Sequence, residues 1–161
     1  MFVLLILHLL IGGAILMSGD RLGRRAFAVA AVAPVATVVW AATKWSAVVG
    51  APGAGAEAVA AGGFARASDV DSASAGPPIF QSVGWISGLD LDLHLRFDAF
   101  ALVMTLLVSG IGALICVYAI GYFSHIEPGQ TRLAGLMTLF AGAMLGIVWA
   151  DHLIALFVAW E

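Results

Sequence analysis

The stretch Leu89-Asp-Leu-Asp-Leu-His-Leu-Arg-Phe97 leads through Asp98 into an apolar run that begins Ala99-Phe-Ala-Leu-Val-Met104 and continues to about Gly121. The first part alternates strictly between apolar and polar residues, and a period of two indicates a β-strand. The second part carries no charged side chain over 23 residues, which is long enough for a helix to cross a bilayer. The sequence therefore predicts that a strand gives way to a transmembrane helix at Asp98.

A partner for this strand lies just before it. Residues Gln81 to Ile86 can pair with it across Ser87-Gly88, which predicts a β-hairpin over residues 79–97. Two strands alone are marginally stable, so the leucine face must pack on helix ends or on a neighbouring subunit. The other face would carry Asp90, Asp92, His94 and Arg96. Such groups on a strand face are ordinarily solvated, so a lid over the helices is favoured over a metal site.

The composition is that of a membrane protein. Hydrophobic residues make up 62% of the chain and charged residues 11%, whereas soluble domains have about 25% charged residues. The net charge of −3 does not suggest a polyanionic partner, and no basic stretch suggests nucleic acid. The single cysteine, Cys116, has no internal disulfide partner and no metal-ligand spacing around it. We therefore expect no metal and no cofactor.

Further apolar segments complete an expected all-α bundle of membrane-spanning helices with one short extramembrane β-hairpin. Pro34 interrupts the second segment, where we expect a kink and not a boundary. Residues 50–78 are rich in Ala, Gly and Ser, which predicts a flexible extracytoplasmic loop. The expected organisation is helices 1 and 2 over residues 2–49 (Phe2 to Met17 and Ala26 to Val49), the loop over 50–78, the hairpin over 79–97, and helices 3, 4 and the start of helix 5 over 97–161 (Phe97 to Gly121, Leu133 to Ala150, and a segment opening near His152).

Charge placement predicts the orientation. The first apolar segment has no positive charge before it, and Arg21, Arg24 and Arg25 follow it. A signal peptide has the reverse order. The positive-inside bias places these arginines in the cytoplasm, so we expect a multi-pass protein of the cell (plasma) membrane with its N-terminus outside.

Glu161 is the strongest candidate functional residue. It lies 10 residues beyond Asp151, so at about 1.5 Å per residue it would sit about 15 Å along the fifth helix, half-way through a hydrocarbon core of about 30 Å. An ionisable group at that depth costs at least about 2.5 kcal/mol on insertion scales and is ordinarily functional. The alternatives are a proton-binding or gating carboxylate and a structural partner to a cation on another helix. A helix ending at the midplane would leave carbonyls unpaired in lipid, so we expect the chain to be the front piece of a longer protein.

Other polar residues have weaker claims. His8, mid-way along the first helix, is either a proton relay or a neutral imidazole bonded to a neighbouring helix. Asp98 and Asp151 precede helices, so both are expected to act as structural caps. The small-residue pattern Gly142-x-x-x-Gly146 predicts close helix packing and not a ligand site.

The region from Phe97 to Glu161 resembles the antiporter-like subunits shared by Mrp-type multisubunit Na⁺/H⁺ antiporters and respiratory complex I, and among these it most resembles the A subunit of the Mrp-type antiporters. The matching residues are Arg96-Phe-Asp98, Leu107-Val-Ser-Gly-Ile-Gly112, Tyr118-Ala-Ile-Gly-Tyr122, Leu139-Phe-Ala-Gly-Ala-Met-Leu-Gly146 and Ala150-Asp-His-Leu-Ile-Ala-Leu-Phe-Val-Ala-Trp-Glu161. The resemblance implies a larger helix bundle with inverted repeats, of which this chain would form the N-terminal helices 1 to 5. It also implies that Glu161 pairs with a lysine on a later, broken helix. This chain has Asp98-Ala99 and Asp151-His152 where the family often has Asp-Gly and Asp-Asn.

The resemblance implies a subunit of a monovalent cation/proton antiporter that contributes part of a proton path. Its partners would be other membrane subunits, the lipid bilayer, H⁺ and Na⁺. No catalytic motif is present, so we expect a subunit of a transporter and not an enzyme. The alternatives are the proton-pumping subunit of a complex I-type quinone oxidoreductase or membrane hydrogenase, and a purely structural membrane subunit.

Overall fold

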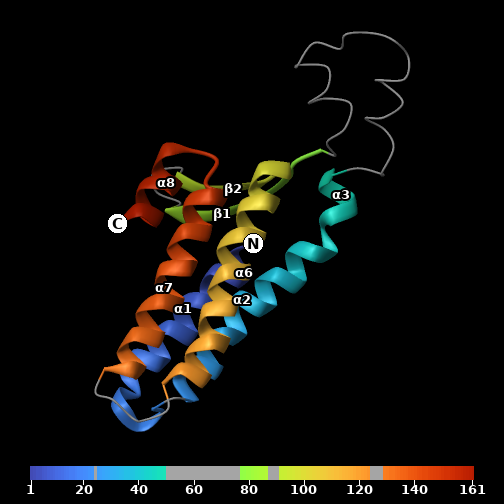
Figure 1. The fold of residues 1–161 in the computed structure, drawn as a ribbon. Coiled ribbons are helices and arrows are strands. Elements are labelled where there is room, and N and C mark those ends of the chain that lie inside the picture. The colour runs from blue at the N-terminus through green and yellow to red at the C-terminus, as the bar shows by residue number, and fades with distance from the viewer. Residues whose placement is uncertain (24, 50–76, 87–90, 124–128) are drawn as a thin grey trace, which may run out of the picture.

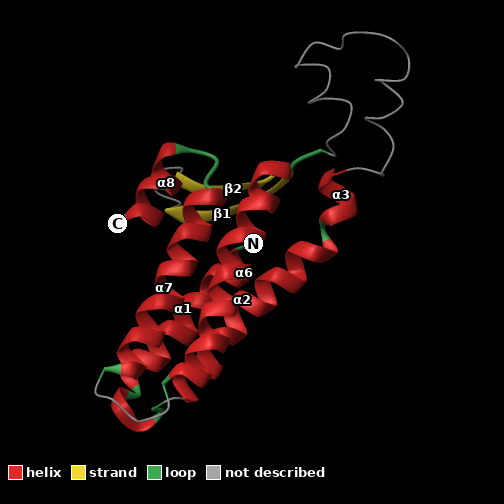
Figure 2. Cartoon of the chain, in the orientation of Figure 1, coloured by secondary structure: helices red, strands yellow, loops and turns green. Residues whose placement is uncertain are grey.

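A computed structural model of the chain describes residues 1–23, 25–49, 77–86, 91–123 and 129–161. Helices dominate it, with one two-stranded sheet (Figures 1 and 2). This confirms the predicted helical fold with a hairpin. The elements are α1 (Phe2–Met17), a 3-10 turn η1 (Gly19–Arg21), α2 (Arg25–Thr43), α3 (Trp45–Val49), β1 (Ile79–Ile86), β2 (Leu91–Phe97), α6 (Ala99–Tyr122), α7 (Gln130–Trp149) and α8 (Leu153–Trp160).

The long helices alternate in direction. In Figure 1, α1 and α6 run away from the hairpin end of the bundle, whereas α2 and α7 run back toward it. Helix α1 packs chiefly on α7, and α2 packs chiefly on α6. The hairpin, α8 and the N-terminus therefore share one end of the bundle.

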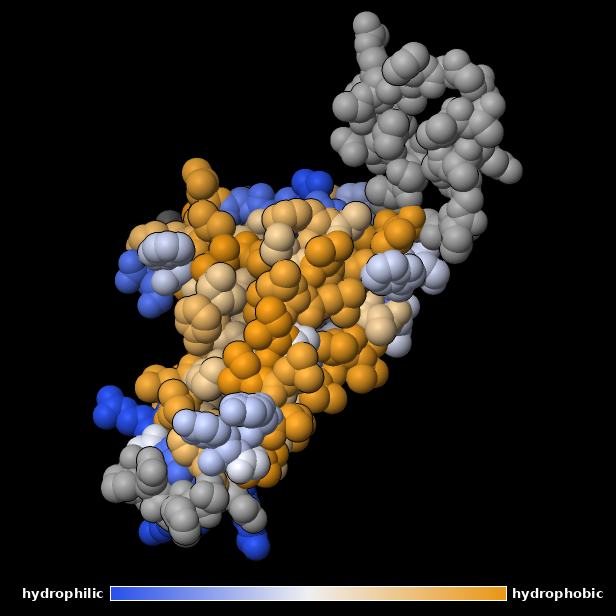
Figure 3. Space-filling view, in the orientation of Figure 1, coloured by the Kyte–Doolittle hydropathy of each residue, from blue (hydrophilic) through white to orange (hydrophobic). Residues whose placement is uncertain are grey.

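Three of the described helices are long and apolar enough to cross a membrane, namely α2, α6 and α7. Helix α1 is also apolar but has only 16 residues. In Figure 3, hydrophobic residues cover most of the visible bundle, and hydrophilic residues gather at its two ends. This pattern is typical of helices that face lipid along their length and polar surroundings at their ends.

The predicted second segment is divided in the structure. Helix α2 ends at Thr43, whose hydroxyl donates to the Trp40 carbonyl at 2.6 Å. The N–H of Lys44 then bonds to the Ala41 carbonyl at 3.0 Å, a shorter loop than the i→i−4 bond of an α-helix. Pro34 lies inside α2 and is buried. The helix thus continues through the proline, and the break falls ten residues later. Residues 50–76, most of the predicted loop, lie outside the described part of the chain.

The hairpin has the predicted antiparallel pairing, with Ile79 opposite Phe97 and Ser82 opposite His94. Leu95 and Phe97 are buried in a core with Met1, Leu4 and Trp149. The other face of β2 is exposed, where the structure describes Asp92, His94 and Arg96. The leucine face therefore packs on the helix ends, as expected from the alternation. Asp90 and the predicted turn lie outside the described residues.

Glycines on α7 allow close approach of its neighbours. A Cβ atom added at Gly142 would lie 2.7 Å from Cβ of His8 in α1, and one added at Gly146 would lie 2.9 Å from Cβ of Ala159 in α8. Neither distance is compatible with a real side chain. This confirms that the small-residue pattern serves helix packing.

Candidate functional site

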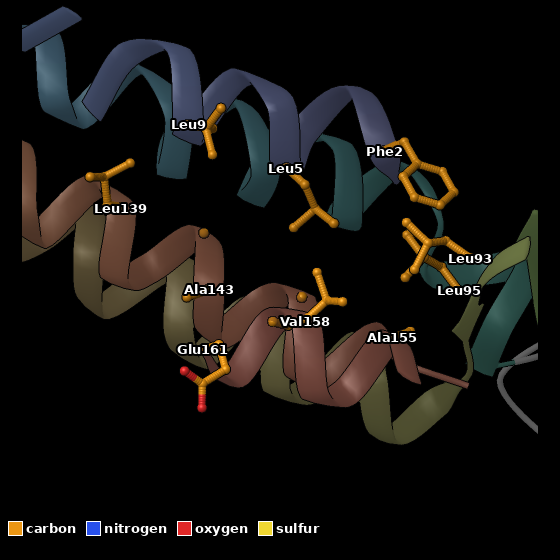
Figure 4. Close-up of a pocket in the computed structure, with 13 residues that line it drawn as sticks. Phe2, Leu5, Leu9, Leu93, Leu95, Leu139, Ala143, Ala155, Val158 and Glu161 are labelled. Carbon is orange, nitrogen blue, oxygen red and sulfur yellow. The ribbon is translucent and has the colours of Figure 1, made fainter. Parts of the chain in front are cut away.

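An apolar groove runs between α1, α7 and α8, and Glu161 lies at its edge (Figure 4). Its cavity volume is about 350 Å³. In Figure 4 the Glu161 carboxylate points away from Leu5 and Leu9, which line the opposite wall. Every other lining residue is apolar: Phe2, Leu5, Leu9, Leu93, Leu95, Leu139, Gly142, Ala143, Gly146, Ala155, Val158 and Ala159. Among the residues that the structure describes, the groove therefore has a single ionisable side chain.

Glu161 is the C-terminal cap residue of α8, and its N–H donates to the Phe157 carbonyl at 3.1 Å. The side chain is exposed. Among the described residues it forms no ion pair, because the only such pair joins Arg96 and Asp98. Its carboxylate is accordingly available to a proton or to a cation from outside this part of the chain.

His8 is fully buried in α1. Its Nδ1 lies 2.8 Å from the Leu4 carbonyl oxygen, and because a carbonyl only accepts, Nδ1 must carry the proton. Nε2 then keeps a lone pair, and it has no hydrogen-bond partner among the described residues. The one hydrogen bond described for the ring is thus within its own helix, one turn back, and a bond to a neighbouring helix is not seen among the described residues.

The α1–α7 contact places His8 against a residue that lines the groove of Glu161. Gly142 lines the groove and is also the residue against which the His8 side chain packs. His8 thus lies next to the groove, separated from it at this point only by a glycine, which has no side chain. A second buried polar atom without a described partner is the hydroxyl oxygen of Ser109 in α6.

Asp98 is the N-cap of α6, as predicted from its position. Its Oδ1 accepts the Ala101 N–H at 2.8 Å, and its Oδ2 pairs with Nη2 of Arg96 at 2.9 Å. Both carboxylate oxygens are therefore engaged at the junction between β2 and α6.

The expected cap at Asp151 is corrected, because His152 is the N-cap of α8. Its Nδ1 accepts the Ala155 N–H at 3.0 Å, and its Nε2 lies 2.7 Å from the Asp92 carbonyl oxygen. An imidazole can accept at one nitrogen and donate at the other, whereas an ionised carboxylate only accepts. His152 can therefore cap the helix and hold strand β2 at once. The backbone supports the link through an Asp151 N–H bond to the His94 carbonyl at 3.2 Å.

Comparison with known proteins finds relatives of part of the chain. Residues 85–133 match the family described as NADH-Ubiquinone oxidoreductase (complex I), chain 5 N-terminus. The A1 subunit of the Na(+)/H(+) antiporter of Staphylococcus haemolyticus is 34% identical over 92 residues, which are 57% of this chain and 11% of that protein. The A1 subunit from Staphylococcus aureus is 35% identical with the same coverage. The L subunit of the NADH-quinone oxidoreductase of Mycobacterium tuberculosis is 39% identical over 79 residues, 48% of this chain and 12% of that protein.

Over these residues the chain is similar to the antiporter-like subunits shared by Na(+)/H(+) antiporters and complex I. The matches span only 11% to 12% of these relatives' length. The family match covers β2, Asp98 and α6, and it ends before Glu161. His8 also lies outside it.

Two contacts near the site were not predicted from the sequence. The His152 link to β2 joins residues 60 positions apart. The buried indole Nε1–H of Trp149 donates to the Thr105 hydroxyl at 2.8 Å. The only available signal was the presence of a hydroxyl inside an apolar helix, which is too common to predict a partner.

Replacing His152 should separate its two roles. His152→Ala loses the cap and the bond to Asp92, so we expect the free energy of unfolding to fall by about 1–2 kcal/mol. His152→Asn keeps a good N-cap residue but shortens the reach to β2, so a smaller loss is expected. Chemical denaturation in detergent micelles measures both, and amide exchange at Ala155 reports the cap. Equal losses in the two variants, with equal exchange at Ala155, would show that His152 does not cap α8.

Proposed function

We propose that this protein is a subunit of a multisubunit monovalent cation/proton antiporter and that Glu161 is its proton-carrying carboxylate. The observation that carries the proposal is the position of Glu161 as the only ionisable side chain among the described residues that line an apolar groove. Support comes from the staphylococcal relatives, which are named as Na(+)/H(+) antiporter subunits.

The chemistry requires Glu161 to alternate between two environments. Apolar surroundings favour the neutral form of a carboxyl group, and a nearby cation favours the charged form. A cationic side chain that approaches and withdraws would therefore make Glu161 release and take up a proton. Such a partner would belong to another segment or subunit, which agrees with the absence of an ion pair at Glu161 among the described residues.

His8 is proposed as a relay on the same path. Its Nε2 lone pair is buried without a described partner, and its side chain packs on the glycine that lines the groove. A neutral imidazole can receive a proton on one nitrogen and release one from the other. His8 would thus pass protons between the bundle interior and the groove.

We propose that the protein lies in the plasma membrane, with the hairpin and the N-terminus outside the cell. Arg21, Arg25 and Arg132 all lie at the end of the bundle opposite the hairpin. The positive-inside bias favours the cytoplasm for that end. The assembly would include other membrane subunits and would carry H⁺ and Na⁺, without a cofactor in this chain.

Exchange in everted membrane vesicles tests the role of Glu161. Glu161→Gln should abolish Na⁺-induced proton movement at normal expression, because an amide cannot carry the proton, whereas Glu161→Asp should keep part of it. Asp92→Asn is the matched control, since it removes an exposed hairpin carboxylate whose backbone, not side chain, holds His152. Undiminished exchange in Glu161→Gln would refute the proposal.

A second candidate function is the proton-pumping subunit of a redox-driven quinone oxidoreductase or hydrogenase. It is favoured by the 39% identity to the L subunit of the mycobacterial NADH-quinone oxidoreductase and by the description of the matching family. Purification of the intact assembly distinguishes the two. Flavin or iron–sulfur protein in the complex, with substrate-driven proton pumping lost in Glu161→Gln, would replace the antiporter proposal. If Glu161→Gln loses neither cation exchange nor proton pumping, a structural role for the subunit would remain.

A further inference from the structure

A pocket of about 490 Å³ opens at the hairpin end of the bundle, between α6 and α7. Two apolar residues of each helix form its walls. Its rim is polar and comes from the β2–α6 junction and from the segment between α7 and α8. The lining residues are Arg96, Asp98, Phe100, Met104, Ile147, Val148, Ala150 and Asp151.

The apolar walls continue along the same pair of helices. A second cavity, of about 440 Å³, lies between α6 and α7 and has a wholly apolar lining: Leu107, Val108, Ile111, Gly112, Ile115, Leu136, Met137, Phe140, Ala141 and Met144. Met104 stands one turn before Leu107 and Val108 on α6, and residues three or four apart share a helix face. Ile147 stands one turn after Met144 on α7. The two cavities therefore follow one another along a single groove, which we call the α6–α7 groove.

The length of the α6–α7 groove suits a lipid chain. Phe100 and Ile115 bound it on α6, and at about 1.5 Å per residue they are about 22 Å apart. One leaflet of a bilayer has about 15 Å of hydrocarbon. The groove is thus long enough to hold an acyl chain below a polar headgroup.

The rim offers one cation with spare donors and one carboxylate without a described ion-pair partner. Arg96 uses Nη2 in its ion pair with Asp98, but a guanidinium has five N–H donors, and the side chain is 49% exposed. Asp98 has both oxygens engaged. Asp151 is exposed and its carboxylate forms no ion pair within the described residues.

We propose that the α6–α7 groove binds a phospholipid whose headgroup carries both a phosphate and a primary ammonium. The phosphate lies at the free donors of Arg96, because a guanidinium recognises phosphate through paired hydrogen bonds. The ammonium lies at Asp151, and an acyl chain follows α6 and α7 toward Ile115. Arg96 and Asp98 pair with each other, so Asp151 is the one charge of the three without a described ion pair. A headgroup with both a phosphate and an ammonium brings a cation to Asp151 and adds no net charge, whereas a purely anionic headgroup would be repelled.

Lipid retention measured on the purified full assembly tests this assignment without reference to transport. The protein is exchanged into nanodiscs of equal phosphatidylethanolamine and phosphatidylcholine, extracted into detergent, and its bound lipid is counted by native mass spectrometry. We expect preferential retention of phosphatidylethanolamine, because a trimethylated ammonium has no N–H to donate to Asp151. Asp151→Asn should reduce that preference at least several-fold, while the matched control Asp92→Asn should keep it.

A folding readout accompanies both variants. Asp151→Asn should unfold at the same temperature as the wild type in lipid-free detergent, since its side chain has no described internal ion pair to lose. Equal retention of the two lipids by the wild type would overturn the proposal, as would an unchanged preference in Asp151→Asn. A crosslink from Phe140→Cys to a helix of another subunit, at the expense of lipid, would overturn it in favour of a protein partner.

Discussion

Replacing Gly142 with leucine is expected to lower the free energy of unfolding by about 3 kcal/mol or more, because overpacking costs about 1–3 kcal/mol where the structure can adjust and here adjustment is blocked. A Cβ at this position meets Cβ of His8 at 2.7 Å. That atom is fixed to the α1 backbone and cannot rotate away, so the two helices must separate. Separation also weakens the close approach of Gly135 to Leu16 further along the same interface. Denaturant titration of the purified protein in detergent micelles measures the loss.

Gly13 in α1 supplies the control. An added Cβ at Gly13 meets nothing within 4 Å, so Gly13→Leu should be neutral or slightly stabilising, because leucine is the better helix former by about 0.5–1 kcal/mol. Equal stability of the Gly13 and Gly142 variants would contradict the packing described for α1 and α7.

A double substitution locates the clash more narrowly. Gly142→Ala adds only the offending methyl group, and His8→Gly removes the atom that it meets. The double variant should lose less free energy of unfolding than the two single variants lose in total, because the effects of residues in contact are coupled. Additive effects would mean that Gly142 and His8 do not touch.

Apolar run length predicted the helices well. Helix α1 has the predicted bounds, Phe2 to Met17, and α6 and α7 differ from prediction by a few residues at their ends. Long uncharged runs have few alternatives in lipid, where every backbone group must be satisfied within the segment. The hairpin was equally predictable, because its period of two places Leu95 and Phe97 on one face.

Local hydrogen bonds decided what the apolar pattern could not. The division of the second segment at Lys44 depends on a tightened turn and on the Thr43 hydroxyl, neither of which changes the hydropathy. His152 can cap α8 because the Asp92 carbonyl lies within reach of its other ring nitrogen. The sequence does not show this, so the general preference for aspartate at helix starts led to the prediction of Asp151 as the cap. The first feature is local backbone geometry, and the second follows from a tertiary contact.

The sequence identifies the residues of the candidate site singly, but it does not show that they lie near one another. Glu161 and His8 each stand out as polar groups within apolar helices. The contact of His8 with Gly142, which lines the groove of Glu161, depends on the pairing of α1 with α7. The hydrophobic pattern does not predict this pairing, because these helices are apolar on nearly every face. Small residues marked α7 as a packing helix, but they did not identify its partner.

Replacing Trp149 with alanine is expected to be the most destabilising change at the hairpin end, with a loss of about 3–5 kcal/mol. The indole is fully buried, and its ring centroid lies 5.9 Å from that of Trp40 in α2 and 6.2 Å from that of Phe97 in β2. Trp149 therefore joins α7 to both α2 and the hairpin. Its removal leaves a cavity that three elements would have to fill together. Trp160→Ala is the control, because that side chain is 74% exposed and its loss should change stability by about 0.5 kcal/mol or less.

Substitutions at the hydrogen bond from Trp149 to Thr105 separate the contribution of this bond from that of the packing of the indole ring. Trp149→Phe keeps most of the ring but leaves the buried Thr105 hydroxyl without its donor, and Thr105→Val leaves the indole N–H unpaired at a cost of about 1–3 kcal/mol. Replacing both partners removes both unsatisfied groups, so the double variant should be more stable than the sum of the single losses predicts. The free energies of unfolding of the four proteins in micelles give this coupling directly. If the two losses simply add, the indole N–H and the Thr105 hydroxyl do not depend on each other, and Trp149 acts at this end of the bundle through packing alone.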